Sequence, residues 1–162
     1  GLVADARQLV DRARVQCQIN RITYSDMIPV DSLAKRICDF KQSFTQYGGS
    51  RPFGTALLIA GVDDNGLHLY ETDPSGAYQS YHAGAIGRGR SVVIDYFENN
   101  WKPNMTLNAG IKMGLEALRE SIEAKLNKEA VEIAVVDAFG YRVLSREETV
   151  AHIDKLKPAF DE

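Results

Sequence analysis

The sequence predicts an α+β fold, because its helix-like and strand-like runs are grouped instead of alternating regularly along the chain. Two stretches with helical spacing of apolar residues come first, and three strand-like stretches follow them. Two more helices, two more strands and a short final helix complete the order. The chain has 162 residues, of which 44% are apolar, so we expect a single domain over residues 1–162.

The first predicted helix covers Leu2 to Ile19, where apolar residues recur every three or four positions. Its apolar face consists of Leu2, Ala6, Leu9, Ala13 and Cys17. A connector at residues 23–29 leads to a second helix. The apolar face of that helix consists of Leu33, Ile37, Phe40, Phe44 and Tyr47. Asp31 is placed to cap its start, and we expect Gly48 to end it in a left-handed conformation.

Three strand-like runs come next. Residues 53–62, FGTALLIAGV, are almost continuously apolar, which indicates a strand buried on both faces. DDNG at residues 63–66 predicts a hairpin turn into the alternating run LHLYE at residues 67–71. DPSG at residues 73–76 predicts a second turn, because proline fixes φ at the second position. Residues 77–84 then form the third strand of an antiparallel meander.

Helical spacing returns in the second half of the chain. One predicted helix carries the apolar residues Val92, Val93, Tyr96 and Phe97. Another opens at Thr106, a good capping residue, and carries Leu107, Ile111, Leu115, Leu118 and Ile122. Both runs have the three- and four-residue spacing of a helix with one apolar face.

The chain then returns to strand alternation and ends in a short helix. Residues 131–137 and 141–145 predict two strands joined by a turn that contains Gly140. Ser145 and Glu148 have the spacing of a capping box. The predicted last helix therefore starts after this serine and continues through about Lys155.

Composition and charge narrow the possible function classes. The net charge of -3 and the pI near 5.7 leave no basic face, so we expect no nucleic-acid partner. No stretch reaches the roughly 18 apolar residues of a membrane span, and no signal-peptide pattern is present, so we expect a soluble chain without a membrane partner. Cys17 and Cys38 occupy apolar positions of predicted helices without a C-x-x-C motif, which predicts buried, reduced thiols and a cytoplasmic location.

The sequence contains no recognisable catalytic or metal-binding constellation. His68, His82 and His152 are scattered, and we interpret each as a solvent-facing or satisfied polar residue. No serine lies in a G-x-S-x-G motif, and GAIGRGR at residues 84–90 matches neither phosphate-loop pattern. Gly1 offers no N-terminal nucleophile. We therefore expect no catalytic residue, no metal and no cofactor.

One loop carries more specialised residues than a simple turn requires. TQYGGSRPFG at residues 45–54 holds an aromatic residue, paired glycines, an arginine and a proline between a helix and a strand. Three segments resemble α-type subunits of the core proteasome, most closely archaeal ones: GLVADAR at residues 1–7, ICDFKQSFTQYGGSRPFGTALLIAGVD at residues 37–63, and LYETDPSGAYQSYHAGAIGRG at residues 69–89. The resemblance covers essentially the whole chain.

For the fold, the resemblance implies a four-layer α/β/β/α N-terminal-nucleophile hydrolase sandwich that is incomplete at its N-terminus. By this comparison the chain lacks the N-terminal third of the family sequence, with its upstream strands and N-terminal helix. The run at residues 53–62 agrees with this implication, because a strand that is apolar on both faces needs a second covering layer. We therefore expect further β-structure upstream of Gly1.

For the function, the resemblance implies a non-catalytic subunit of the sevenfold α-rings that cap the catalytic β-rings of the proteasome. The loop that consists of Tyr47, Gly48, Gly49 and Ser50 is implied to line the axial pore. In such a constriction the glycines allow close backbone approach and the tyrosine sets the width. Arg51 and Pro52 would stiffen the return into the strand.

The resemblance also implies a docking site and a set of partners. Gly1 and Leu2 are implied to form part of the pocket that receives the C-terminal tails of regulatory ATPases or other activators, together with a lysine located before position 1. Backbone N–H groups at a helix start suit a carboxylate. The expected partners are other α-subunits, proteasome β-subunits, these C-terminal tails, and unfolded polypeptide that passes through the pore.

Two other functions and one simpler interpretation of the loop remain open at this point. The chain could be a catalytic N-terminal-nucleophile peptidase or amidohydrolase whose nucleophile lies upstream. It could also be a standalone α+β binding domain that shares only the fold. In the simpler interpretation of the loop, Tyr47 ends a helix, Gly48 stops it and Pro52 precedes a strand, without any pore.

Overall fold

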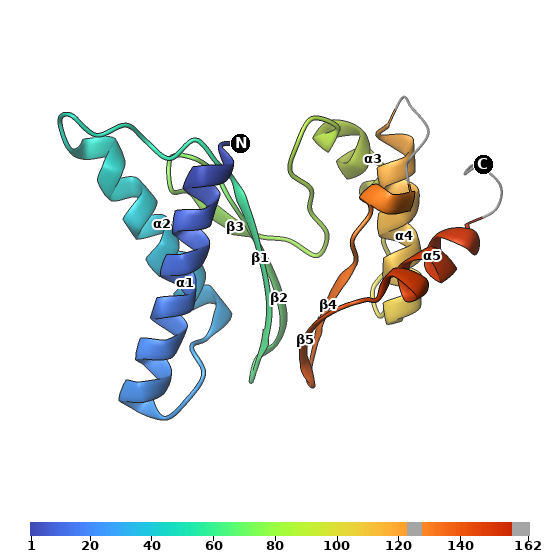
Figure 1. Cartoon of the computed structure of the whole chain (residues 1–162), viewed down its shortest axis with the longest axis horizontal. Coiled ribbons are helices and arrows are strands. Elements are labelled where there is room, and N and C mark those ends of the chain that lie inside the picture. The colour runs from blue at the N-terminus through green and yellow to red at the C-terminus, as the bar shows by residue number, and fades with distance from the viewer. Residues whose placement is uncertain (123–127, 157–162) are drawn as a thin grey trace. The chain divides into compact units, whose positions relative to one another are not determined.

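The computed structural model describes residues 1–122 and 128–156, which fall into two compact units, Gly1–His82 and Ala83–Glu162 (Figure 1). Each unit has its own helices, strands and apolar core. The single domain expected over residues 1–162 stays a prediction. Within the described residues, no helix is both long enough and apolar enough to cross a membrane.

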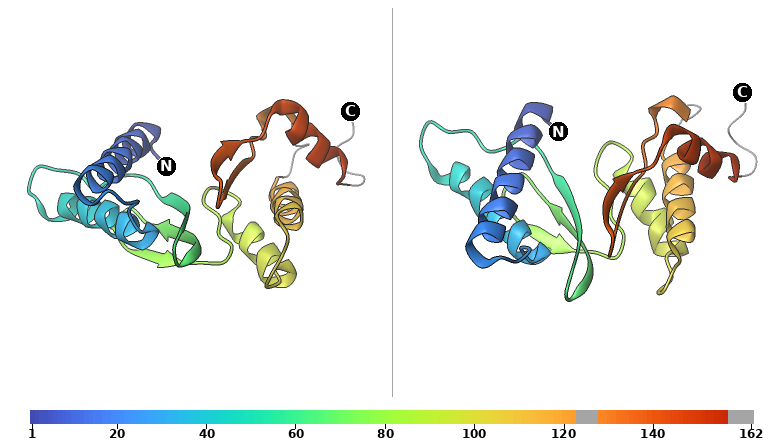
Figure 2. Two further views of the ribbon diagram at one scale, coloured as in Figure 1. Left: turned by 90° about the horizontal axis from the view of Figure 1, so that it is seen from below. Right: turned by 60° about the horizontal axis from the view of Figure 1, so that its bottom comes forward.

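Two helices open the first unit, namely α1 (Val3–Tyr24) and α2 (Val30–Gln46). They lie side by side against the sheet of this unit (Figure 2). Helix α1 continues beyond its predicted end at Ile19 and stops at Ser25, whose φ of 56° is left-handed. The N–H of Ser25 donates to the carbonyl of Arg21 at 2.9 Å, which closes the last turn. The connector is therefore shorter than predicted.

The start of α2 is capped from the sheet and not by Asp31, so the predicted capping role of Asp31 is wrong. Pro29 occupies the N-cap position, and its side chain accepts no hydrogen bond. Asp31 lies inside the first turn, where its carboxylate accepts from the N–H of Ser32 at 2.6 Å. The N–H of Val30 donates instead to Asp63 Oδ2 at 3.0 Å. A residue 33 positions away in sequence thus supplies the cap.

The sheet of the first unit is antiparallel, with the strand order β1 (Leu57–Asp63), β2 (Gly66–Thr72), β3 (Tyr78–Ser80). Its register pairs Asp63 with Gly66, which confirms the predicted DDNG hairpin. The DPSG turn is also confirmed, because the N–H of Gly76 donates to the carbonyl of Asp73 at 3.2 Å. Gly76 has a φ of 94°, a conformation that favours glycine. The third strand is shorter than predicted.

The apolar run that follows the loop is less covered than predicted. Its first residues, 53–56, precede the strand ladder, which begins at Leu57. Within β1, Leu58 is 38% exposed and Ala60 is also exposed, whereas Leu57 and Ile59 are partly buried. The predicted burial on both faces is wrong for the described structure, because Leu58 and Ala60 lie on a face of the strand that the apolar core of this unit leaves exposed.

That core lies between α1, α2 and the segment that leads into β1. Leu9 and Ile37 are fully buried and Phe53 is 5% exposed. Partly buried residues pack around these three, namely Ala13, Leu33, Phe40, Phe44 and Leu57. The central residues of the two predicted apolar faces therefore meet in this core, whereas Leu2 and Tyr47 at their ends are exposed. Cys38 is buried as predicted, whereas Cys17 is only partly buried, and both thiols are free.

The second unit contains α3 (Arg90–Asn100), α4 (Leu107–Glu120), a 3-10 turn (Lys128–Ala130), β4 (Ala134–Asp137), β5 (Gly140–Val143) and α5 (Arg146–Asp154). Strands β4 and β5 form an antiparallel hairpin, as predicted. Two predicted caps are confirmed. Thr106 Oγ1 accepts from the N–H of Ala109 at 3.3 Å, and the capping box of Ser145 and Glu148 is complete.

Helices α4 and α5 build the core of the second unit. Leu115, Ile153 and Leu156 are at most 4% exposed, and Ile111, Val131 and Ile133 pack against them. Val131 and Ile133 belong to the predicted strand but precede Ala134, the first paired residue of β4. The strand is therefore shorter than predicted. Helix α4 ends at Glu120. Ile122, which was predicted to lie on the apolar face of this helix, is therefore outside it.

Gly61 provides a test of the contact between β1 and α2. A Cβ built at Gly61 would lie 2.6 Å from Val30 Cγ2, which is too close for van der Waals contact. We expect Gly61→Ala to lower the free energy of unfolding by about 1–3 kcal/mol, the usual cost of overpacking. Urea denaturation measures this change.

Removal of the clashing atoms provides the matched control for this substitution. Val30→Ala alone should destabilise through lost burial, but the double variant should be more stable than the sum of the two single changes. Additive effects of Gly61→Ala and Val30→Ala would contradict the contact.

Candidate functional site

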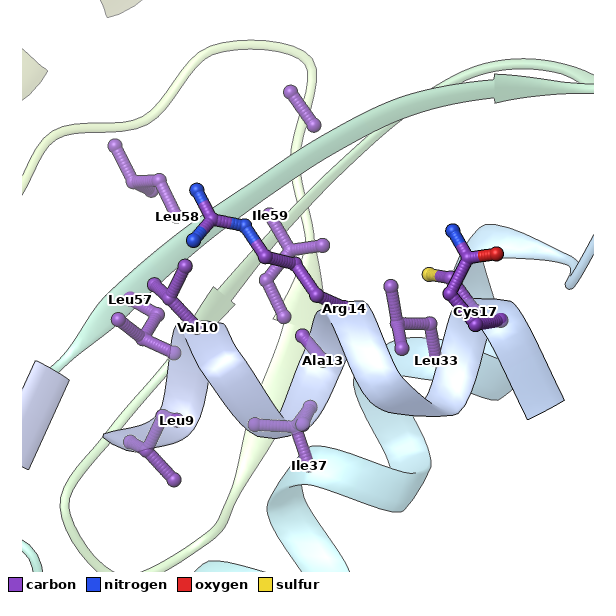
Figure 3. A pocket seen from close by; sticks show the side chains of 12 residues that line it. Leu9, Val10, Ala13, Arg14, Cys17, Leu33, Ile37, Leu57, Leu58 and Ile59 are labelled. Carbon is purple, nitrogen blue, oxygen red and sulfur yellow. The ribbon is translucent and has the colours of Figure 1, made fainter. Parts of the chain in front are cut away.

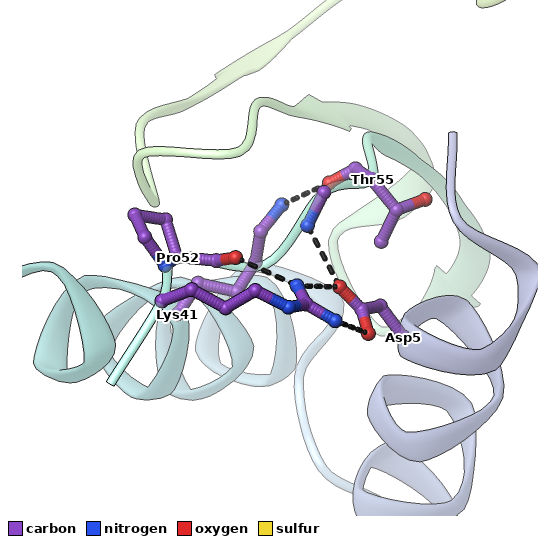
Figure 4. Close-up of polar contacts among 6 residues, drawn as sticks. Asp5, Lys41, Pro52 and Thr55 are labelled. Carbon is purple, nitrogen blue, oxygen red and sulfur yellow. Dashed lines mark hydrogen bonds and ion pairs between the residues drawn. The ribbon is translucent and has the colours of Figure 1, made fainter. Parts of the chain in front are cut away.

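A buried carboxylate in the first turn of α1 organises the region around the specialised loop. Asp5 is 6% exposed and accepts two hydrogen bonds from the Arg51 guanidinium, Nη1 to Oδ2 at 2.7 Å and Nη2 to Oδ1 at 2.8 Å (Figure 4). The N–H of Gly54 donates to Asp5 Oδ2 at 2.8 Å. The Arg51 hydrogen bonds, followed by the Gly54 bond, lower the pKa of Asp5 from 3.8 to about 2. The carboxylate is therefore charged at neutral pH, and both of its oxygens accept hydrogen bonds.

The start of the chain contacts the same backbone segment, at Gly54. The N–H of Leu2 donates to the carbonyl of Gly54 at 2.8 Å. A Cβ built at Gly1 would lie 2.6 Å from that carbonyl oxygen, and one built at Gly54 would lie 2.8 Å from Leu2 Cδ1. A side chain at position 1 would therefore push the two backbones apart, whereas a side chain at position 54 would first displace the flexible Leu2 side chain.

A second buried charge holds the next residue from the side of α2. Lys41 is fully buried, and its Nζ donates to the carbonyl of Thr55 and to Thr72 Oγ1, both at 3.0 Å. Thr72 Oγ1 also accepts from the N–H of Leu57 at 3.2 Å. Desolvation lowers the pKa of Lys41. Lys41 thus links α2 to the entrance of β1 and to the end of β2.

Three aromatic rings, two from α2 and one from the segment that leads into β1, pack against one another. The ring centroids of Phe40 and Phe44 are 5.0 Å apart, and those of Phe44 and Phe53 are 4.9 Å apart. The third pair, Phe40 and Phe53, is separated by 5.5 Å. Residues 51–55, which we call the anchor segment, are therefore fixed by α1 on one side and by α2 on the other.

The loop at residues 47–50 projects directly from the anchor segment. The N–H of Ser50 donates to the carbonyl of Tyr47 at 3.2 Å, and Gly49 has a φ of 84°, as in a type II turn. Tyr47 is 70% exposed. Glycine adopts the left-handed conformation at Gly49, so the prediction for Gly48 is wrong. The helix ends first, at an extended Tyr47, and the left-handed residue belongs to the turn that follows.

The structure connects the two predicted sites through residues that the sequence analysis did not select. Gly1 and Leu2 touch the anchor segment through Gly54, and the loop is joined covalently to its other end. Asp5 and Lys41 were both missed. Asp5 precedes Leu9 by four positions, and Lys41 follows Ile37 by four, so each charge lies on the apolar face of its helix. A charge on such a face signals a buried polar contact.

A concave feature lies between α1, α2 and β1. This pocket has a volume of about 360 Å³, and Figure 3 shows its mainly aliphatic lining. The lining residues include Leu9, Val10, Ala13, Ile37, Leu57 and Ile59. Arg14, Cys17 and Gln18 add polar groups without a convergent set of acids or bases. The pocket therefore has the lining of an apolar contact surface.

His68 and Asp63 of the first unit are structural partners. His68 Nε2 lies 2.8 Å from Asp63 Oδ1, so His68 is a satisfied polar residue, as predicted. The Val30 hydrogen bond is the largest cause that holds the pKa of Asp63 below its usual value. Across residues 1–122 and 128–156, no group of three or more His, Cys, Asp or Glu side chains is arranged to hold a metal ion.

Residues 1–136 match the family model described as proteasome subunit. The chain belongs to the proteasome subunit family. This finding confirms the resemblance and the predicted α+β, N-terminal-nucleophile hydrolase-like fold class.

Several archaeal relatives of this family align with nearly the whole chain. It is 51% identical to the proteasome subunit alpha of Methanothermobacter thermautotrophicus over 158 residues, which are 96% of this chain and 64% of that protein. The corresponding protein of Methanosarcina mazei is 49% identical with the same coverage. That of Methanobrevibacter smithii is 52% identical over 96% of this chain and 63% of its own length. The chain thus spans slightly less than two thirds of these relatives.

Substitution of the buried lysine tests the link between α2 and the anchor segment. Lys41→Met keeps most of the side-chain volume but leaves the Thr55 carbonyl and Thr72 Oγ1 without this donor. We expect the free energy of unfolding to fall by about 1–3 kcal/mol in a urea titration. Lys35→Met is the matched control, because Lys35 forms an exposed pair with Asp39 on the same helix. Equal effects of both substitutions would contradict the role of Lys41.

Acid titration tests the Asp5 contacts. Because the pKa of Asp5 is lowered in the folded state, its stabilising contribution is present above pH 3.8 and is lost as the pH falls towards 2. Asp5→Asn should therefore destabilise at pH 6 and remove part of the stability loss between pH 4 and 2, as followed by thermal unfolding. Asp11→Asn, which breaks an exposed pair with Arg14 on the same helix, is the matched control, and a stability loss at pH 6 as large as that of Asp5→Asn would contradict the prediction.

Proposed function

We propose that this chain is a non-catalytic α-type subunit of the proteasome core particle that works in a ring with other α-subunits. The observation that carries this proposal is the near-complete alignment with archaeal proteins named proteasome subunit alpha. In this proposal the ring stacks on proteasome β-subunits, which carry out the hydrolysis. The chain itself supplies no catalytic residue, metal or cofactor, and it acts in the cytoplasm without nucleic acid or membrane.

The second part of the proposal assigns the axial pore to Tyr47, Gly48, Gly49 and Ser50. Three properties of this turn support the assignment. It is exposed, its backbone is closed by its own hydrogen bond, and its base is fixed by the anchor segment. A constriction repeated around an axis needs such a projecting element on a rigid base, because a loose loop would not define a width. Unfolded polypeptide is the molecule that this pore admits.

The third part assigns the docking of activator C-terminal tails to Gly1 and Leu2 at the start of α1. Leu2 is the N-cap residue and makes no side-chain cap, so the first N–H groups of the helix lack a side-chain acceptor at that position. Such a helix start attracts a carboxylate through its N–H groups and its dipole. The N–H of Leu2 is already bonded to Gly54, so the groups of the following residues would bind the tail.

Assembly is the first test of the proposed function. The chain is co-expressed with archaeal proteasome β-subunits, and the products are analysed by native mass spectrometry. A ring-sized complex that contains both chains is expected. A stable monomer that never associates with β-subunits would contradict the proposal and favour a standalone binding domain.

Tyr47→Ala tests the pore assignment in the assembled particle. Removal of the ring from an exposed turn should widen the constriction and change the rate at which an unfolded protein is degraded. Hydrolysis of the smallest fluorogenic peptides should stay the same, because these already pass freely. Tyr141→Ala is the control, since Tyr141 is also 70% exposed but lies on β5. Unchanged degradation of unfolded protein in the Tyr47 variant would refute the pore role.

A further inference from the structure

The turn between β1 and β2 carries a chemically reactive dipeptide. Asn65 is followed by Gly66, and no other asparagine of the sequence precedes a glycine. The side-chain carbonyl carbon of an asparagine lies within reach of the next backbone nitrogen, which can attack it. A following glycine favours this attack, because it has no Cβ to hinder the approach and its backbone adopts many conformations. Asn65 is therefore the asparagine whose sequence context best suits loss of the side-chain amide.

The structure leaves this dipeptide accessible. Asn65 is exposed, and its side chain forms no hydrogen bond within the described residues. A Cβ built at Gly66 would meet nothing within 4 Å, so no neighbour crowds this residue. The turn is the projecting end of the β1–β2 hairpin (Figure 2), where local opening costs little free energy. By contrast, the amides of Asn20, Asn99 and Asn100 donate to backbone carbonyls at 3.2, 2.7 and 2.8 Å.

From these observations we propose that Asn65 is a site of non-enzymatic deamidation, and that its conversion loosens the hold of Asp63 on the start of α2. The Gly66 nitrogen bonds to Asn65 Cγ and gives its proton to solvent, while the bond between Cγ and Nδ2 breaks and ammonia leaves. Water then opens the cyclic imide at either carbonyl, which yields aspartate or isoaspartate. Nothing is oxidised or reduced, and water is the co-reactant. The proposal does not depend on the function proposed above.

The link from the turn to α2 runs through both oxygens of Asp63. Oδ1 accepts from the N–H of Asn65 at 2.8 Å and lies 2.8 Å from His68 Nε2. Oδ2 accepts from the N–H of Val30 at 3.0 Å, which is the contact that caps α2. The N–H of residue 65 thus orients the carboxylate that satisfies the first turn of the helix.

Each product of deamidation disturbs this arrangement. Aspartate at position 65 adds a negative charge beside Asp63 and Asp64, and like charges at close range repel each other. Isoaspartate also places the side-chain methylene in the backbone, which changes the register that pairs Asp63 with Gly66. Both changes weaken the bond between the N–H of residue 65 and Asp63 Oδ1. The Val30 N–H then loses part of its acceptor.

Incubation of the 162-residue chain in mildly alkaline water enriched in heavy oxygen tests the modification, because base generates the attacking nitrogen anion. Peptide mapping by mass spectrometry should show loss of the amide and uptake of the label at Asn65. Asn104 is the internal control, since it is also exposed but precedes Met105, and it should keep its amide. An unmodified Asn65, or equal conversion of Asn65 and Asn104, would overturn the proposal.

Hydrogen exchange tests the link to α2. Ion-exchange chromatography separates the converted chain from the parent, and the Val30 amide is followed in both forms. Its exchange rate should rise by on the order of tenfold in the converted chain, the effect of a weakened helix cap. The Leu9 amide of α1 is the reference and should keep its rate. An unchanged rate at Val30, or an equal rise at Leu9 that reports global unfolding, would overturn the link.

Asn65→Ser provides the matched control variant. Serine keeps the backbone N–H that Asp63 accepts and suits a turn, but it lacks the reactive amide. The Val30 exchange rate of this variant should match that of the parent and stay constant during the incubation. A rate that rises with incubation time in Asn65→Ser would contradict the proposal, because the change at Val30 would then have a cause other than Asn65.

Discussion

The arrangement of the first unit depends on the need to satisfy one buried carboxylate. Asp5 lies on the inner face of α1, where an ionised group is tolerated only with strong hydrogen-bond donors around it. Arg51 and the N–H of Gly54 supply these donors, and neither can do so unless the segment at residues 51–54 runs past the first turn of α1. The requirement of one side chain thus fixes the path of a loop far away in sequence.

Lys41 imposes the corresponding requirement from α2. Its buried ammonium needs acceptors, and the Thr55 carbonyl and Thr72 hydroxyl provide them where two strands meet the helix. Apolar packing alone, as among Phe40, Phe44 and Phe53, would tolerate small shifts of the chain, whereas directed hydrogen bonds would not. The two buried charges and the three rings together explain why the exposed turn at residues 47–50 has a defined base.

Much of the fold could be predicted from the sequence, because helical spacing and turn chemistry are local signals. The faces of α1 and α2, the DDNG and DPSG turns and the capping box at Ser145 all follow from residues within four positions of one another. Several errors are local, such as the helix ends and the left-handed glycine, but one involves a long-range partner. Asp31 looked like a cap, but Asp63 of a distant hairpin takes that place. The pairing of Asp5 with Arg51 could not be read from spacing, although the position of each buried charge on an apolar face was visible.

The separation between Asp5 and Arg51 also has a consequence for how the chain folds. The pair closes a segment of 46 residues, whereas the helices and hairpins of this unit need only neighbouring residues. Loop-closure entropy places such a contact late, after the local elements have formed. Its loss should then accelerate unfolding and hardly slow refolding, which a chevron plot would display as a change confined to the unfolding arm. The bond that defines the base of the loop would in this way also set the kinetic lifetime of the native unit.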